Sequence, residues 1–127
     1  MIKILENNRF FTISITGLIA ITIFILSSIP GTATQGLGIR GLSIIYHFMI
    51  FFLFNLFLLI SIIGKRKIKS KYIIISILVS FVYAILDEIH QLFTIFRNAS
   101  IGDVITDLFG ILFSTIIYLY LKKIKQF

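Results

Sequence analysis

Cysteine is absent from this 127-residue sequence, and charged residues are scarce, at 13%. Without cysteine there is no disulfide framework, no thiolate metal site and no cysteine nucleophile. Soluble domains carry about a quarter charged residues, so the composition argues against an ordinary soluble protein. The HExxH zinc motif and the nucleophile elbow of hydrolases are also missing. The sequence therefore offers no standard hydrolase motif, and its length allows one compact unit, expected to be a single domain over residues 1–127.

Long apolar runs dominate what is present. Hydrophobic residues make up 58% of the chain, and the mean hydropathy is +1.07. A helix needs about 20 apolar residues to cross a hydrocarbon core of about 30 Å, and in lipid every backbone amide must be paired within its own segment. We therefore predict an all-α membrane protein, a bundle of four transmembrane helices. The predicted spans are Phe10–Ile29, Ser43–Ile63, Tyr72–Phe93 and Asp103–Leu121.

The basic residues are distributed unequally between the two sides of these spans. Ten of the twelve precede the first span, fill the second loop or follow the last span, which leaves Arg40 and Arg97 for the other side. Bases that flank apolar runs orient a membrane protein, and they stay on the cytoplasmic side. We therefore expect both termini to be cytoplasmic and no nucleic-acid partner. The ten bases are Lys3, Arg9, Lys65, Arg66, Lys67, Lys69, Lys71, Lys122, Lys123 and Lys125.

Polar residues inside the spans gather at one depth. At a rise of 1.5 Å per residue, they lie about 22–28 Å from the inner lysines, in the outer quarter of the membrane. Four of the five acids belong to this layer. Ionisable groups in hydrocarbon are costly and usually face the bundle interior, where they find partners. With the outer connection included, the candidate ligand-binding residues are His47, Asp87, Glu88, His90, Gln91, Arg97, Ser100, Asp103 and Asp107.

Arg97 is the expected counter-ion for these acids, and Arg40 is a second candidate, because a guanidinium can grip a carboxylate with two parallel hydrogen bonds. A structural explanation competes at several positions. Ser100 and Asp103 have the spacing of a helix-capping box, and Gln91 can bond across helices. His90 can likewise lie at a helix interface, and His47 can be a satisfied core histidine.

Three chemical interpretations of the layer remain open. It can bind a polar headgroup or a charged drug. It can instead be an enzyme site that uses acid–base chemistry on a lipid-linked substrate, with candidate catalytic residues His47, Asp87, Glu88, His90 and Asp107. A metal or proton site from His47, His90, Asp87 and Asp107 is the third, but the spacing matches no known metal signature. We therefore expect no metal and no cofactor. Of the other two interpretations, we favour a binding site over an enzyme.

The same residues resemble the VanZ-like family of membrane proteins. The resemblance rests on segments 87–93 (DEIHQLF), 97–100 (RNAS) and 103–107 (DVITD), followed by Gly110, and it extends over nearly the whole chain. The family commonly has glycine where this chain has Phe96, and an acidic and a basic residue where it has Ser43 and Ile44. Members are named after a protein that confers resistance to the glycopeptide teicoplanin.

The resemblance implies a bacterial protein of the cytoplasmic membrane, and the depth of the polar layer adds the expectation that it acts at the outer face. Its expected partners are membrane lipids, including a lipid-linked cell-wall precursor, or a glycopeptide whose access it alters.

Overall fold

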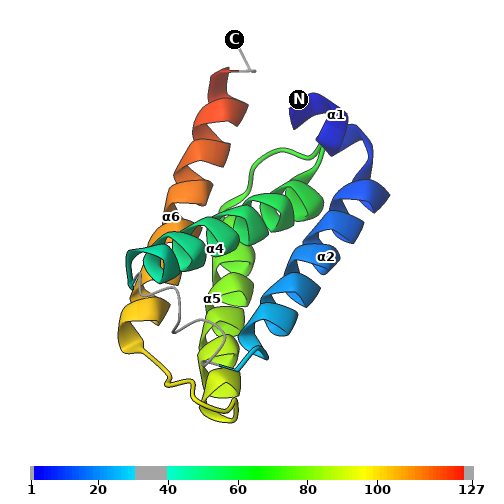
Figure 1. The fold of residues 1–127 in the computed structure, drawn as a ribbon. Coiled ribbons are helices and arrows are strands. Elements are labelled where there is room, and N and C mark those ends of the chain that lie inside the picture. The colour runs from blue at the N-terminus through cyan, green and yellow to red at the C-terminus, as the bar shows by residue number, and fades with distance from the viewer. Residues whose placement is uncertain (1, 31–39, 125–127) are drawn as a thin grey trace.

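The computed structural model describes the backbone of residues 2–30 and 40–124, and all regular structure within these ranges is helical. Four of the helices are long and apolar enough to cross a membrane, which confirms the predicted architecture. No predicted span end lies more than three residues from the observed one. The helices are α1 (Ile2–Asn7), α2 (Arg9–Ser27), α4 (Arg40–Ile63), α5 (Ser70–Leu92) and α6 (Ile101–Ile124) (Figure 1). Most of the predicted loop Pro30–Leu42, residues 31–39, lies outside the described residues.

Local sequence signals set the helix ends. The side chain of Asn8 accepts a hydrogen bond of 3.1 Å from the amide of Phe11, which satisfies one unpaired donor at the start of α2. Pro30 disfavours helical backbone at the residue before it, and α2 ends at Ser27. After α4, Gly64 has φ +50°, the left-handed conformation that glycine adopts most easily at a helix end.

Helix α4 is the centre of the bundle. It packs against α2, α5 and most extensively α6. Two apolar clusters fill the interior. The first contains Ile23, Phe51, Phe54, Ala84 and Ile111. The second contains Leu59, Ile60, Ile63 and Tyr118.

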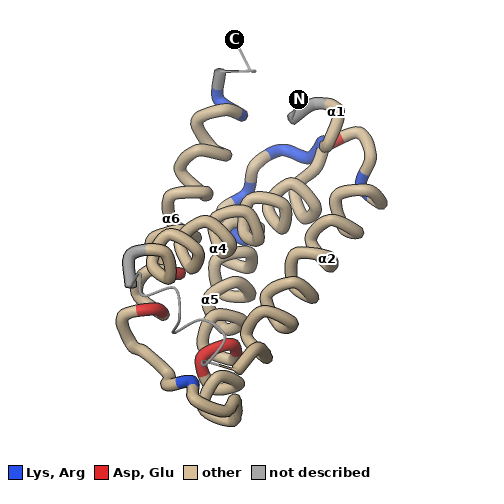
Figure 2. Tube along the Cα trace, viewed as in Figure 1, with Lys and Arg blue, Asp and Glu red and all other residues tan. Residues whose placement is uncertain are grey.

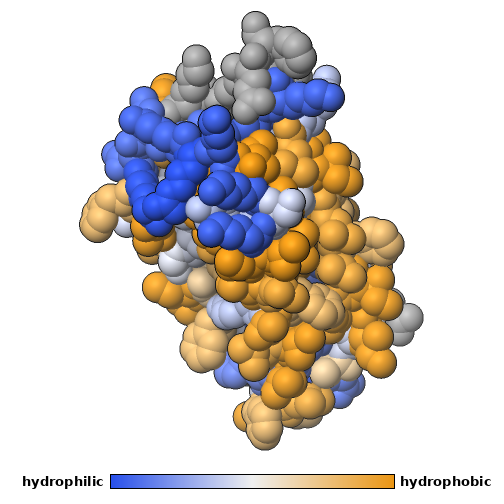
Figure 3. Space-filling model, turned by 180° about the vertical axis from the view of Figure 1, so that it is seen from behind, coloured by the Kyte–Doolittle hydropathy of each residue, from blue (hydrophilic) through white to orange (hydrophobic). Residues whose placement is uncertain are grey.

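On the face shown in Figure 3, apolar side chains cover most of the length of the bundle, and the largest hydrophilic patch lies at one end. Phe10 and Phe93, for example, are more than four-fifths exposed. Polar side chains such as Asn55 and Asp107 are fully buried instead. Apolar residues outside and polar residues inside are what a lipid environment requires, so the surface supports the membrane assignment.

Charge is segregated along the bundle axis. Most lysines and arginines lie at the end that carries α1, the α4–α5 loop and the last turn of α6, whereas the acids other than Glu6 lie toward the opposite end (Figure 2). The segregation agrees with the expected two-sided distribution of charge. That the basic end is cytoplasmic stays a prediction.

Helix α1 is an element that the sequence did not predict. Its Glu6 accepts a hydrogen bond of 2.8 Å from Nζ of Lys122 on α6, and the same amine donates to the carbonyl oxygen of Gly64 at 2.5 Å. Lys122 is buried. This ion pair ties the start of the chain to the end of the last span and to the α4–α5 loop.

Candidate functional site

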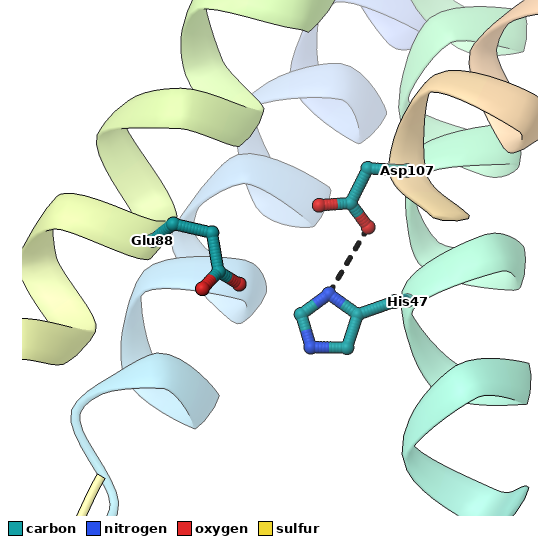
Figure 4. A group of neighbouring side chains, drawn as sticks. All are labelled: His47, Glu88 and Asp107. Carbon is teal, nitrogen blue, oxygen red and sulfur yellow. Dashed lines mark hydrogen bonds and ion pairs between the residues drawn. The ribbon is translucent and has the colours of Figure 1, made fainter. Parts of the chain in front are cut away.

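Three helices bring His47, Glu88 and Asp107 together in the bundle interior (Figure 4). One potential ligand atom from each side chain lies within 4.8 Å of those of the other two. His47 comes from α4, Glu88 from α5 and Asp107 from α6, and their exposed fractions are only 2%, 4% and 0%. We call these three residues the acidic–histidine cluster.

The closest contact in the cluster joins His47 and Asp107. Nδ1 of His47 lies 3.0 Å from Oδ1 of Asp107, a hydrogen bond between two buried groups. The other carboxylate oxygen of Asp107, Oδ2, is buried and has no hydrogen-bond partner, and it lies on the side of Glu88 (Figure 4). A buried carboxylate oxygen without a donor is rare in folded proteins, so the cluster has hydrogen-bonding capacity that the described chain leaves unused.

Glu88 also supports the start of α6. Its Oε2 accepts a hydrogen bond of 2.7 Å from the backbone amide of Ser100, directly before α6. The hydroxyl of Ser100 in turn lies 3.3 Å from the amide of Asp103 and accepts from it. In a capping box the acid three residues on would bond the amide of the capping residue; here an acid from α5 takes that place. The predicted capping role of Ser100 is confirmed in this modified form.

A backbone contact between α4 and α6 places His47 and Asp107 within reach of each other. A Cβ atom on Gly110 would overlap the carbonyl oxygen of Phe48, so only glycine permits this approach. Asp107 lies three residues before Gly110, on the same face of α6, and His47 directly precedes Phe48. The absence of a side chain at Gly110 therefore allows α4 and α6 to pack closely.

A comparison with family models agrees with the earlier resemblance. The model described as VanZ/LLP1 matches residues 6–122, nearly the whole chain. The chain belongs to the VanZ/LLP1 family. No curated protein and no solved structure matches it.

In this VanZ/LLP1 protein, Asp103 lies at the edge of the acidic–histidine cluster. Its Oδ2 is 3.9 Å from Nε2 of His47, and its side chain is 22% exposed, against 3% for that of His47. Asp87 and Gln91 lie beside the cluster on α5 and are also buried. Nε2 of Gln91 donates to Oδ2 of Asp87 at 3.1 Å and, at 3.4 Å, to Oε1 of Glu88. These two hydrogen bonds of Gln91 thus stay within α5, whereas the sequence had left open a bond across helices.

His90 points away from the cluster. Its Nε2 lies 2.9 Å from the hydroxyl of Ser28, and its ring packs against Phe24 with centroids 4.7 Å apart. It therefore joins α5 to the end of α2, as expected for a histidine at a helix interface. The four-residue metal set considered from the sequence is not assembled: the metal-capable group combines His47 and Asp107 with Glu88, and omits Asp87 and His90.

The prediction that Arg97 forms an ion pair with the acids is wrong. The guanidinium of Arg97 donates to the carbonyl oxygens of Leu26, at 3.1 Å, and Ile29, at 3.2 Å. The last carbonyls of a helix lack partners within the helix and carry partial negative charge, so the end of α2 satisfies this cation. The side chain of Arg40, the second candidate, lies outside the described residues.

Sequence reasoning missed a polar network deeper in the bundle, centred on Asn55. Its amide nitrogen lies within 3.0 Å of the carbonyl oxygen of Ile111 and the hydroxyls of Ser114 and Thr115 on α6. Its oxygen accepts hydrogen bonds from Ser76 and Ser80 on α5. A lone asparagine in an apolar run was the available signal, since such residues often bond across helices in membranes.

Proposed function

We propose that this VanZ/LLP1 protein acts at the outer face of the cytoplasmic membrane, where the acidic–histidine cluster binds the polar headgroup of an envelope lipid or lipid-linked cell-wall precursor. Binding there alters the access of glycopeptides such as teicoplanin. The observation that carries the proposal is the unpartnered, buried Oδ2 of Asp107 beside two further polar side chains from separate helices. A bound polar group would satisfy it, and bundle interiors are a common place for ligand sites.

The position of the cluster supports an outer-face site. It lies away from the lysine-rich end (Figure 2), and lysine-rich loops stay cytoplasmic. Because the chain has no cysteine, single cysteines at Lys67 and Asn98, both exposed, can be labelled in intact cells with a membrane-impermeant maleimide. We expect labelling at position 98 and none at 67. Labelling at 67 alone would place the cluster near the cytoplasm and overturn the outer-face assignment.

A small intramembrane enzyme is the second candidate. The hydrogen bond of 3.0 Å between His47 and Asp107 favours it, because a carboxylate that orients an imidazole is a common element of acid–base catalysis. Glu88 supplies a second carboxylate within the same cluster. Its substrate would be a lipid-linked envelope component.

Amide variants separate the two functions. Asp107→Asn and Glu88→Gln keep the shape of the side chain but cannot carry the proton. A binding site should lose about 10- to 150-fold in affinity, the equivalent of one charged hydrogen bond of ~1.5–3 kcal/mol. A catalyst should lose about two to four decades in rate. His90→Gln is the matched control, because His90 contacts Ser28 and lies outside the cluster.

The experiment measures teicoplanin binding to cells and envelope-lipid composition in the same cultures of a susceptible host. Altered drug binding with unchanged lipids supports a binding site. A lipid species that appears with the wild type and disappears with Asp107→Asn supports the enzyme. If neither measurement differs between wild type and empty vector, both functions are wrong.

A further inference from the structure

We propose that the acidic–histidine cluster is a divalent-cation site of the Zn²⁺ class, with one nitrogen of His47 and one carboxylate oxygen each of Glu88 and Asp107 as ligands. The proposal rests on the headgroup-binding function and adds to it, because it names the cation that the cluster binds and to which the headgroup would then bind. It reverses the expectation from the sequence that no metal binds.

The spacing of the side chains suits an ion. Atoms no more than 4.8 Å apart lie within about 2.8 Å of a common point, and zinc bonds to nitrogen and oxygen are about 2.0–2.2 Å. Small side-chain rotations would close that gap.

An independent observation at the same place is the unpartnered oxygen of Asp107. Oδ2 is buried without a hydrogen-bond partner on a side chain with no exposed area, and it faces the side of Glu88 (Figure 4). The other oxygens of the cluster have contacts with His47, Gln91 or the amide of Ser100. The chain therefore holds the carboxylate of Asp107 in place from one oxygen and leaves the other for a ligand.

Charge balance points the same way. Two carboxylates in a buried, membrane-embedded site need compensating positive charge. Arg97 is satisfied by the carbonyl oxygens of Leu26 and Ile29. Within the described part of the chain, no lysine or arginine nitrogen lies within 4.0 Å of Glu88 or Asp107. A neutral imidazole, two carboxylates and a divalent cation sum to zero charge.

The ligand set selects the class of metal. Ca²⁺ takes six to eight oxygen ligands, and Mg²⁺ prefers oxygen and keeps several waters. An imidazole favours Zn²⁺ and neighbouring transition metals. Zinc sites with three protein ligands keep one position open for water or a substrate. The open position would receive an oxygen of the headgroup, so that a site rich in carboxylates could bind an anionic group such as a phosphate.

The test uses the full chain purified in detergent, freed of metal with a chelator and titrated with Zn²⁺ by equilibrium dialysis. We expect about one equivalent bound to the wild type. His47→Gln, Glu88→Gln and Asp107→Asn should each weaken binding at least tenfold, whereas His90→Gln should bind as the wild type does. Circular dichroism confirms that each variant is folded.

A second measurement needs no variant. The X-ray absorption spectrum of the Zn²⁺-loaded wild type should show one imidazole and otherwise oxygen ligands. No stoichiometric binding, equal binding by all variants, or a spectrum without imidazole would each overturn the proposal.

Phospholipid that copurifies with the same samples is quantified in parallel. One equivalent of Zn²⁺ with no lipid retained would leave the metal site standing and refute headgroup binding. If the wild type binds no Zn²⁺ but retains lipid that Asp107→Asn loses, headgroup binding is supported and the metal site is refuted.

Discussion

Replacing Asn55 by leucine tests whether the buried polar network holds the bundle together. Asn55 lies on α4 and is fully buried, with polar contacts to both α5 and α6. Leucine has nearly the same shape but no polar atoms. The substitution therefore removes the hydrogen bonds and changes the packing little.

The magnitude follows from counting the bonds that disappear. A side-chain amide can donate two hydrogen bonds and accept two, so about four are lost. Ser114 and Thr115 keep an acceptor, because both hydroxyls also donate to the carbonyl oxygen of Ile111. Ser76 and Ser80 lose their acceptor and can turn to a carbonyl of their own helix. At an average of ~0.6 kcal/mol per interhelical bond in a membrane protein, the free energy of unfolding should fall by about 2 kcal/mol.

Unfolding in mixed micelles of dodecyl sulfate and a mild detergent, followed by helical circular dichroism, measures this loss. Thr22→Val is the matched control, because the exposed hydroxyl of Thr22 donates to the carbonyl oxygen of Leu18 in its own helix and, among the described residues, bonds to no other helix. We expect a change within about 0.5 kcal/mol for the control. If Asn55→Leu is as stable as Thr22→Val, or more stable than wild type, the network does not stabilise the bundle and the reasoning fails.

Three further predictions use the same unfolding assay. Gly110→Ala should cost about 1–3 kcal/mol through backbone overlap, whereas Gly17→Ala, whose Cβ would meet nothing within 4 Å, should be neutral or stabilising; equal effects would contradict the close contact. Lys122→Met should leave the largely enclosed carboxylate of Glu6 without its cation and cost up to about 3–5 kcal/mol. Adding Glu6→Gln should recover part of that loss, and strictly additive losses would exclude coupling. Phe96 has φ +59°, so Phe96→Gly should stabilise by ~1 kcal/mol, and a destabilised variant would show that contacts of the ring outweigh the strain.

The long helices were predictable because hydrophobic length depends on sequence alone. A run of about 20 apolar residues has one stable solution in lipid, and the observed ends follow it closely. Helix α1 was not predictable in the same way. It is only six residues long, too short to be stable by itself, and its contact with α6 through Glu6 depends on the fold.

The position of the site along the helices could be predicted from the sequence, but the residues that meet there could not. Counting residues along each helix put His47, Asp87, Glu88 and Asp107 in one layer. Adjacent residues point about 100° apart around a helix, so the choice between Asp87 and Glu88 depends on how α5 rotates against α6, which packing decides. The partners of Arg97 were not predicted, because backbone carbonyls such as those of Leu26 and Ile29 cannot be recognised from the residue types. The backbone conformation at Phe96 did have a sequence signal: the family commonly has glycine at this position, and Phe96 has positive φ.

Glu88 connects the cluster to the beginning of the last span, because its carboxylate takes part in both. One oxygen holds the backbone amide of Ser100, and the carboxylate also belongs to the cluster. A ligand that draws this carboxylate toward His47 and Asp107 would lengthen its hydrogen bond to the amide of Ser100. Occupancy of the site would then loosen the first turn of α6 and speed exchange of that amide. The hydrogen-exchange rate of a single amide, that of Ser100, is accordingly an intrinsic gauge of whether the cluster holds a ligand.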